Sequence, residues 1–338
     1  MSQKVILLMG LMASGKSSVV AQLVTAPDAP RYMILSRDER GGKVRGLLPQ
    51  FQQELADGHS VILDNTFLTV ESRKPFIEAA QEAGVPVECH WLQTDIVDCQ
   101  FNALKRMMDR WGRIFWVNDD IKAHDEAKKD PHTFPLLALF AAKRRLHGDK
   151  KKGVPSGKPT MDEGFSKIVK VPFERRPSKG LNKALILDYD GTLRDDARNH
   201  GGELPYPTNV LEVHGLPGRQ AVLQDYKAKG YLLLGVSNQS GIGKGLVSEE
   251  TVIACMAETN RQVTGNANGI DFHFCPHHNF PVSCYCRKPQ AGIGVWLIRQ
   301  HDLDPSQCIF VGDMTSDRTF AARCGFQYVN ADEFFRGS

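Results

Sequence analysis

Hydrophobic residues in this chain gather in short runs, and longer amphipathic stretches separate most of these runs. The runs are rich in branched residues: Val5–Met9, Tyr32–Leu35, Val61–Leu63, Val87–Trp91, Ala184–Leu187, Tyr231–Val236 and Ile309–Val311. Such runs are typical of parallel strands that are buried on both faces, and the stretches between them are typical of the helices that cover those sheets. The pattern predicts an α/β fold with two doubly wound parallel-sheet domains.

The alternation stops between Phe134 and Pro177, where Gly and Pro are dense enough to end regular structure. A basic run in this region is explained by a solvated linker or by contact with nucleic-acid phosphates. Apolar positions from 165 to 173 predict a short segment that packs back on the first domain. We therefore expect a first domain at residues 1–178, including the basic linker, and a second domain at residues 179–338.

The composition is that of a soluble globular protein, with 41% hydrophobic and 24% charged residues in a chain of 338. A formal net charge of +3 permits a polyanionic substrate without requiring one. The apolar runs are too short to span a membrane, and the first strand begins too early to leave room for a signal peptide. These features predict a cytoplasmic protein with no membrane contact.

Residues 10–17 match the pattern G-x-x-x-x-G-K-[ST], between the first expected strand and a helix. In this context backbone N–H groups curl around a phosphate chain at a helix N-terminus. We expect Lys16 to neutralise the β- and γ-phosphates of a nucleoside triphosphate such as ATP, and the Ser17 hydroxyl to bind its Mg²⁺. The expected nucleotide-binding residues are Gly10, Ser14, Gly15, Lys16, Ser17 and Ser18.

Carboxylates also follow the next two strands. Asp38 comes after the second strand and is a candidate general base for an acceptor hydroxyl. Asp64 ends the third strand and is placed to hold Mg²⁺ through water or to orient arginines around the acceptor substrate. Arg106 and Arg110 share one face of an expected helix, where they either stabilise the transferring phosphoryl group or form a solvated basic face.

The residues at 36–38, 60–66 and 102–106 resemble those of the 5′-hydroxyl polynucleotide kinase module, and the resemblance extends over about residues 5–113. It implies Asp38 as the base and Arg106 as an arginine of a lid. It also implies an arginine that binds the phosphate beside the acceptor hydroxyl. The spacing of the animal enzymes places that arginine at Arg45, and Arg40 is the competing candidate.

The sequence D-x-D-G-T follows the strand at 184–187. Paired aspartates at a strand end are explained by a divalent cation between them, since burying both charges alone is costly. We expect Asp188 to attack phosphorus and Asp190 to act as acid and then base. Later strand ends supply Ser237 for a phosphate oxygen, and Asp313 and Asp317 for Mg²⁺; Lys288, in an Arg-Lys-Pro sequence, supplies a cation beside the nucleophile.

This ordered series resembles the haloacid dehalogenase-like phosphatase superfamily across residues 184–330. The resemblance implies a Rossmann-like phosphatase domain after the P-loop NTPase-like kinase domain. It also implies Mg²⁺ at Asp188, Asp190 and Asp313. We expect the substrate to contact Ser237, Asn238 and Arg287.

Three of the eight cysteines cluster with a histidine, in two pairs at i, i+2 spacing: Cys275, His277, Cys284 and Cys286. In extended chain each pair projects to one face, so the four can form a tetrahedral metal site. A reduced, metal-free thiol cluster is the alternative. The pattern resembles the structural zinc loop of heptose-bisphosphate and histidinol-phosphate phosphatases, which implies a Zn²⁺ that fixes the loop presenting Arg287 and Lys288.

Together these features predict a bifunctional enzyme of DNA or RNA repair that phosphorylates 5′-hydroxyl ends and removes 3′-phosphates. Its partners would be nucleic-acid ends, and its products would be suitable for a ligase. The alternative is an enzyme that acts with both domains on small phosphorylated metabolites. A non-catalytic sensor of nucleic-acid ends is disfavoured, because the catalytic carboxylates are all present.

Overall fold

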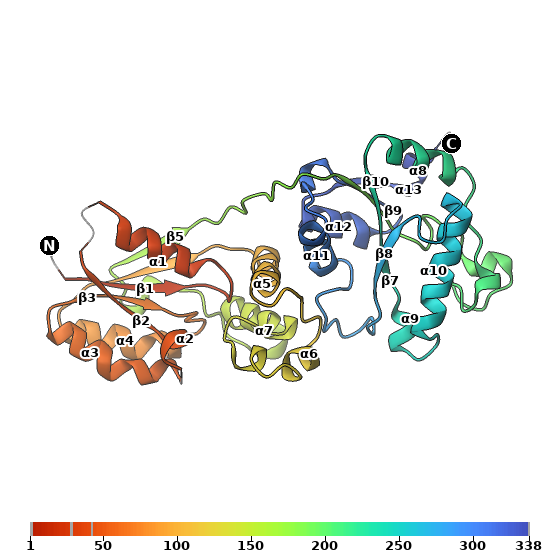
Figure 1. The fold of residues 1–338 in the computed structure, drawn as a ribbon. Coiled ribbons are helices and arrows are strands. Elements are labelled where there is room, and N and C mark those ends of the chain that lie inside the picture. Colours follow the sequence, from red (N-terminus) through yellow and green to blue (C-terminus); the bar gives the residue numbers. More distant parts are fainter. Residues whose placement is uncertain (1–2, 28–29, 42, 337–338) are drawn as a thin grey trace. The chain divides into compact units, whose positions relative to one another are not determined.

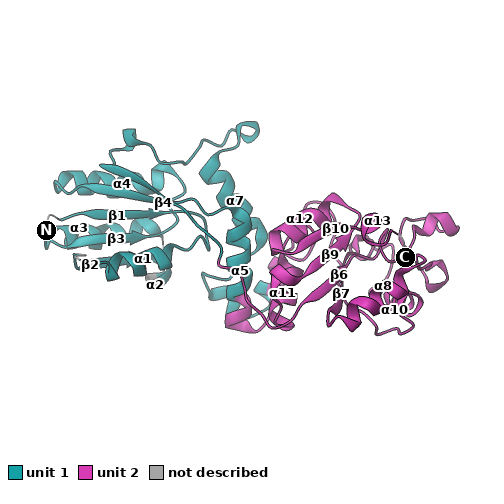
Figure 2. Cartoon of the chain, turned by 90° about the horizontal axis from the view of Figure 1, so that it is seen from above, with its two compact units in different colours: residues 1–106, 121–175 teal, residues 107–120, 176–338 magenta. Residues whose placement is uncertain are grey.

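The computed structural model describes residues 3–27, 30–41 and 43–336 (Figure 1). The chain forms two compact units (Figure 2). Unit 1 comprises Met1–Arg106 and Ile121–Arg175, and unit 2 comprises Met107–Asp120 and Arg176–Ser338. The boundary between residues 175 and 176 lies close to the one expected between residues 178 and 179. The inclusion of residues 107–120 in unit 2 was not expected.

Unit 1 contains a five-stranded parallel sheet in the order β2-β3-β1-β4-β5. Its strands are β1 (Val5–Met9), β2 (Tyr32–Ser36), β3 (Ser60–Asp64), β4 (Val87–Leu92) and β5 (Lys167–Val171). The strands expected from the apolar runs are all present, and the segment from 165 to 173 supplies β5, which pairs with β4. The prediction that this segment packs back on the first domain is therefore confirmed.

The helices of unit 1 cover both faces of this sheet (Figure 1). They are α1 (Lys16–Thr25), α2 (Arg37–Arg40), α3 (Leu48–Ala56), α4 (Val70–Glu82), the first part of α5 (Ile96–Trp111), the end of α6 (Asn118–Lys122) and α7 (Leu136–His147). In β1, Val5 and Leu7 pack into the core that contains Phe51 of α3 and Phe76 of α4. The alternate residue Ile6 packs with Val20 of α1 on the opposite face. Burial on both faces explains why β1 is apolar throughout.

The region from 134 to 177 is more ordered than the sequence predicted. It contains α7 and β5, so most of the expected linker is part of the fold of unit 1. The basic residues themselves are exposed, at Lys143, Arg144, Arg145, Lys150, Lys151 and Lys152. Exposure agrees with a solvated basic surface and leaves it available to an anionic partner.

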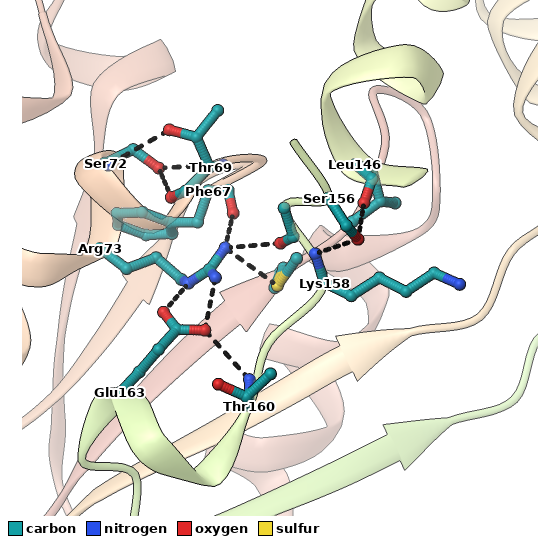
Figure 3. A network of polar contacts seen from close by, with 11 residues as sticks. Phe67, Thr69, Ser72, Arg73, Leu146, Ser156, Lys158, Thr160 and Glu163 are labelled. Carbon is teal, nitrogen blue, oxygen red and sulfur yellow. Dashed lines mark hydrogen bonds and ion pairs between the residues drawn. The ribbon is translucent and has the colours of Figure 1, made fainter. Parts of the chain in front are cut away.

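A buried arginine anchors this region (Figure 3). Arg73 of α4 is fully buried, and it donates two hydrogen bonds of 2.7 and 2.8 Å to the carboxylate of Glu163. Its third nitrogen donates to the carbonyl oxygens of Phe67 and Gly157, both at 2.9 Å. A buried charge is tolerated only when it is paired and hydrogen-bonded. Arg73 therefore ties the segment around Glu163 to the rest of unit 1.

Unit 2 contains a second five-stranded parallel sheet, in the order β10-β9-β6-β7-β8. Its strands are β6 (Ala184–Leu187), β7 (Leu232–Asn238), β8 (Asp271–Cys275), β9 (Ile309–Gly312) and β10 (Gln327–Asn330). Its complete helices are α8 (Arg219–Ala228), α9 (Ser240–Gly243), α10 (Glu249–Thr264), α11 (Gly292–Gln300), α12 (Thr315–Cys324) and α13 (Ala331–Phe334). The predicted α/β class with two parallel-sheet domains is confirmed.

The two faces of this second sheet are also covered. Leu187 of β6 packs with Leu223 of α8 and Met256 of α10. Phe310 of β9 meets Phe320 of α12 edge to face, with ring centroids 5.2 Å apart. In the described part of the chain, no helix is both long enough and apolar enough to cross a membrane.

We predict that Glu163→Ala destabilises unit 1 by about 3 kcal/mol, because it leaves the Arg73 charge buried without its partner. Amide hydrogen exchange of β1 measures this loss, since those amides exchange only when unit 1 opens. The matched control is Glu78→Ala, which removes a carboxylate from the exposed pair Lys74–Glu78. The control substitution should lower the free energy of unfolding of unit 1 by only about 0.3 kcal/mol. Equal protection of β1 in the two variants would contradict the anchoring role of Arg73.

Candidate active sites

The carboxyl ends of β1, β2 and β3 meet at a pocket of about 200 Å³ in unit 1. Lys16 follows β1, Asp38 follows β2, and Asp64 ends β3. All three line the pocket, together with Ser14, Gly15, Ser17 and Arg106. Because parallel strands bring their carboxyl ends to one edge, residues far apart in sequence converge there. Gly10 and Ser18 are not among the lining residues of this pocket.

The phosphate-binding loop is held from outside by two side chains. The hydroxyl of Thr94 donates to the carbonyl oxygen of Ser14 at 2.7 Å, and the Asn102 amide of α5 donates to that of Ala13 at 2.9 Å. Ala13 and Gly15 have positive φ angles of 57° and 96°. The left-handed conformation bends the loop, and the two hydrogen bonds to its carbonyl oxygens hold it in that shape.

Lys16 lies inside this loop, and its ammonium donates to the carbonyl oxygen of Leu11 at 2.8 Å. Burial lowers the pKa of Lys16 to about 8, and the nearby carboxylate of Asp64 opposes that shift. A phosphate anion in the loop would favour the charged form of the lysine. The site is therefore suited to an anionic ligand that replaces the carbonyl contact.

Asp38 lies at the rim of the pocket, and its side chain is 36% exposed. It forms an ion pair of 2.8 Å with Arg37, a residue that the sequence analysis did not assign to the site. The amide nitrogen of Asn65 is buried in the pocket lining without a hydrogen-bond partner among the described residues. His132 also lines the pocket. Arg37 and Asn65 lie within the two stretches that carry the resemblance but were not assigned a role, whereas no motif indicated His132.

Only one of the arginines expected at the kinase site lines the pocket in the described part of the chain. Arg106 lines the pocket, as expected, whereas Arg110 is not among the lining residues. Arg45 is exposed on a 3-10 turn at Val44–Leu47 and does not line the pocket either. The side chain of Arg40 lies outside the described part of the chain. The identity of the arginine that binds the acceptor phosphate thus stays a prediction.

A second group of charges lies in unit 2, where a buried lysine joins two buried carboxylates. The ammonium of Lys288 lies 2.8 Å from Asp188 and 2.8 Å from Asp317. It also donates to the carbonyl oxygen of Val236 at 2.8 Å. Burial raises the pKa of Asp188 to about 7, Lys288 opposes this shift, and Asp317 adds to it. Burial alone would lower the pKa of Lys288, but the two carboxylates raise it.

Asp188, Asp313 and Asp317 each offer an oxygen to one cluster, whose atoms lie within 4.8 Å of one another. Oxygen ligands from carboxylates suit Mg²⁺. Asp190, also expected at the metal, is not part of this cluster, and its carboxylate accepts hydrogen bonds from Arg194 at 2.8 Å and from Gln239 at 2.9 Å. The carboxylate of Asp190 is thus oriented by two residues that were not assigned to the site from the sequence.

The three residues expected to contact substrate differ in their surroundings. Ser237 is buried and accepts a hydrogen bond from Gln239 at 2.8 Å. Asn238 exchanges two hydrogen bonds with the backbone of Lys288, at 2.9 and 3.1 Å, so it positions that lysine. One guanidinium nitrogen of Arg287 is buried and lacks a hydrogen-bond partner in the described structure. An anionic substrate would satisfy that nitrogen.

The expected metal ligands Cys275, His277, Cys284 and Cys286 converge, with ligand atoms within 4.8 Å of one another. The sulfur atoms of Cys275 and Cys284 lie 3.7 Å apart. Zinc–sulfur bonds of about 2.3 Å in a tetrahedron place two sulfur atoms about 3.8 Å apart. The arrangement therefore fits a zinc ion, and it immediately precedes Arg287 and Lys288.

Comparison with known proteins relates the two units to different groups. Residues 5–115 match the family model described as an AAA domain, which agrees with a P-loop nucleotide-binding unit. A solved structure of D,D-heptose 1,7-bisphosphate phosphatase from B. bronchiseptica, complexed with magnesium and phosphate, is 29% identical. It matches with a TM-score of 0.38 over 43% of this chain and 78% of that chain.

Two curated relatives are heptose-1,7-bisphosphate 7-phosphatases. The D-glycero-β-D-manno enzyme of Pasteurella multocida is 34% identical over 143 residues, which cover 40% of this chain and 74% of that protein. The D-glycero-α-D-manno enzyme of Mycobacterium bovis is 35% identical over 144 residues, which cover 42% of this chain and 73% of that protein. The aspartate motifs assign this similarity to unit 2.

We predict that Gly191→Ala lowers the phosphatase activity of unit 2 by about 100-fold, because small displacements of reacting groups have effects of this size. A Cβ atom at Gly191 would lie 2.5 Å from a carboxylate oxygen of Asp313. The control is Gly230→Ala, which has a similar positive φ of 80° and no heavy atom within 4 Å of the added Cβ. Phosphate release from p-nitrophenyl phosphate measures both. If the two variants lost similar amounts of phosphatase activity, backbone strain at a positive φ would explain the effect without the contact to Asp313.

Proposed function

We propose that the chain, which belongs through unit 2 to the family of the heptose-bisphosphate 7-phosphatases and joins that unit to a kinase-like P-loop unit, processes nucleic-acid ends. Unit 1 transfers the γ-phosphate of a nucleoside triphosphate to a 5′-hydroxyl. Unit 2 hydrolyses a 3′-phosphate. The observation that carries the proposal is the position of the partly exposed Asp38 in the lining of the phosphate-binding pocket, paired with the exposed Arg37.

In the kinase step, Asp38 accepts the proton of the attacking hydroxyl. The hydroxyl oxygen bonds to the γ-phosphorus, and the bond to the leaving diphosphate breaks. Lys16 and Arg106 lie in the same pocket and stabilise negative charge on the transferring group. When bound with the nucleotide, Mg²⁺ supplies further charge compensation, and Ser17 is the residue placed to hold it.

The rim around Asp38 favours a long anionic acceptor. Arg37 pairs with Asp38 in the described structure, and Lys43 and Arg45 follow on an exposed segment. An acceptor hydroxyl at an exposed carboxylate can belong to a large molecule whose remainder stays outside the pocket. Exposed basic side chains attract the phosphates of such a molecule, and the attraction weakens as the salt concentration rises.

In the phosphatase step, Asp188 attacks phosphorus, and Asp190 protonates the oxygen of the leaving alcohol. Asp190 then takes a proton from the water that hydrolyses the aspartyl-phosphate. Lys288 compensates the charge of the nucleophile from 2.8 Å. A Mg²⁺ ion held by Asp188, Asp313 and Asp317 would neutralise the phosphate and favour the ionised nucleophile.

The cysteine cluster supports a structural Zn²⁺. Cys275, Cys284 and Cys286 are buried, and with His277 they complete four ligands, which leaves no open position for a substrate. The ion would hold together the two ends of the loop that runs directly into Arg287 and Lys288. Its contribution is to fix the position of the catalytic lysine.

A second candidate function is favoured by the relatives of unit 2, whose names state a heptose bisphosphate as substrate. On this alternative the chain removes a phosphate from a sugar bisphosphate, and unit 1 phosphorylates a small hydroxylated metabolite. The catalytic residues are the same in both cases. The difference lies in the molecule that carries the reacting hydroxyl or phosphate.

We predict that the chain transfers labelled γ-phosphate from ATP to a 5′-hydroxyl oligonucleotide in the presence of Mg²⁺. Asp38→Ala should lower this rate by about 1,000-fold, the effect expected for a lost general base. Asp188→Asn, a change in the other unit, should leave it unaltered. Transfer to free sugars but not to DNA or RNA oligonucleotides would support the metabolite alternative instead.

For unit 2, we predict release of phosphate from a 3′-phosphorylated oligonucleotide and no detectable release by Asp188→Asn, which lacks the nucleophile. Lys16→Ala serves as the control because it alters unit 1 only. The same assay with heptose 1,7-bisphosphate and histidinol phosphate compares kcat/KM between substrate classes. A higher kcat/KM for the sugar bisphosphate than for the oligonucleotide would reject the nucleic-acid assignment of unit 2.

A further inference from the structure

A second cluster of metal-ligating side chains lies on β8, apart from the four cysteine and histidine ligands. Asp271 and His273 project from the same face of this edge strand, at i, i+2. His301 follows the last residue of α11 and reaches the same place. The Nε2 atom of His273 lies 3.3 Å from one oxygen of Asp271, and that of His301 lies 3.5 Å from the other.

The two imidazole nitrogens in this cluster are not satisfied by the protein. Both Nε2 atoms are buried, and neither has a hydrogen-bond partner among the described residues. Their contacts with Asp271 are therefore short of hydrogen-bonding geometry. Buried polar atoms are nearly always paired, and an unpaired one is commonly explained by a water molecule or an ion that belongs there. Here two such atoms face opposite oxygens of one carboxylate.

The spacing of the three ligand atoms fits a metal ion. Zinc binds imidazole nitrogen and carboxylate oxygen at about 2.1 Å, so two ligands in a tetrahedron are separated by about 3.4 Å. Each Nε2 atom lies at about this separation from a different oxygen of Asp271, at 3.3 and 3.5 Å, and one ligand atom from each of the three residues lies within 4.8 Å of the others. We propose that Asp271, His273 and His301 form a second divalent transition-metal site, occupied by Zn²⁺.

The cluster is held in place by contacts that do not involve the proposed metal. The indole of Trp296 lies against His273, with ring centroids 4.4 Å apart, and meets His301 edge to face at 6.2 Å. The backbone of His301 donates to Leu297 and accepts a hydrogen bond of 2.9 Å from the Asn182 amide. Because their surroundings fix both imidazoles, little side-chain order would be lost on binding the ion.

The chemistry of the three groups selects the type of ion. Two imidazoles and one carboxylate suit zinc and neighbouring transition metals, whereas Mg²⁺ and Ca²⁺ prefer oxygen ligands. The exposed carboxylate of Asp271 gives the ion a route from solvent. The cluster of Glu54, Asp57 and His59 differs, since it has one imidazole and its His59 nitrogen already contacts Glu54 at 2.8 Å.

The proposed ion would link the edge strand β8 to the C-terminal end of α11. These two elements flank the segment that contains the cysteine ligands and Lys288, because β8 ends at Cys275 and α11 begins at Gly292. A metal bond at the far end of each element would restrain this segment from both sides. The consequence is a zinc-dependent increase in the stability of unit 2, separate from the ion held by the cysteines.

The test is the zinc content of the full-length chain and of three variants, measured by elemental analysis after dialysis at a fixed free zinc concentration. Wild type should hold one equivalent more than Asp271→Asn, and His301→Gln should lose the same equivalent. Cys284→Ser should lose a different one. The two sites can be distinguished with Co²⁺, because only the cysteine site gives thiolate-to-cobalt charge-transfer absorption, whereas the site at Asp271 adds visible ligand-field absorption without it.

The control is His200→Gln, which alters a histidine that contacts a single carboxylate, Asp195, at 3.0 Å. Its metal content should equal that of wild type. Asp271→Asn is the deciding variant, since the position is exposed and the change conserves shape, so that circular dichroism and the charge-transfer band should stay normal. Equal zinc content in wild type and Asp271→Asn would overturn the proposal and reduce the cluster to an ion pair.

Discussion

The contact between Lys288 and two buried carboxylates is the constraint on which unit 2 depends. Asp188, Lys288 and Asp317 come from three distant segments, and each would be costly to bury alone. With Asp313 included, three carboxylates face one ammonium, an imbalance that a divalent cation can correct. The fold of unit 2 must therefore keep the ends of β6 and β9 close to the loop before α11. Asn238 forms hydrogen bonds with the backbone of Lys288, and the cysteine loop directly precedes this lysine in the sequence. Both therefore help to hold Lys288 in position.

The parts of this architecture that could be predicted are those encoded locally. The P-loop is a continuous eight-residue pattern, and the first aspartates of unit 2 directly follow a buried strand, so each motif carries its own structural context. Most strands were recognisable because burial on two faces demands unbroken apolar runs. The edge strands β8 and β10 were not among the expected runs, because they are only partly buried and carry polar residues. Cys275, His277, Cys284 and Cys286 were predictable because their spacing reflects a single loop. Lys16, Asp38, Asp64 and Arg106 meet in one pocket because parallel strands share an edge.

What could not be predicted depends on contacts between distant positions. Arg73 and Glu163 are separated by 90 positions, and nothing near either residue indicates that the segment between 134 and 177 folds against α4. Gly and Pro were interpreted there as ends of regular structure, although α7 and β5 lie among them. His132 and Gln239 belong to sites only through the fold. The same holds for His301, whose role in a cluster with Asp271 depends on where α11 ends.

The joining of two opposite activities in one chain constrains the substrate more than either site does alone. A kinase converts a hydroxyl into a phosphate ester, and Asp188 would convert a phosphate ester back into a hydroxyl. If both acted on one position, the net result would be hydrolysis of the nucleoside triphosphate. Fusion is therefore productive only if the two reactions address different positions. A polynucleotide meets that condition because its 5′ and 3′ ends are chemically distinct, and a sugar bisphosphate meets it through two different carbons. A polynucleotide also suits the exposed position of Asp38, because one long molecule can present its two kinds of end to the separate sites of the two units.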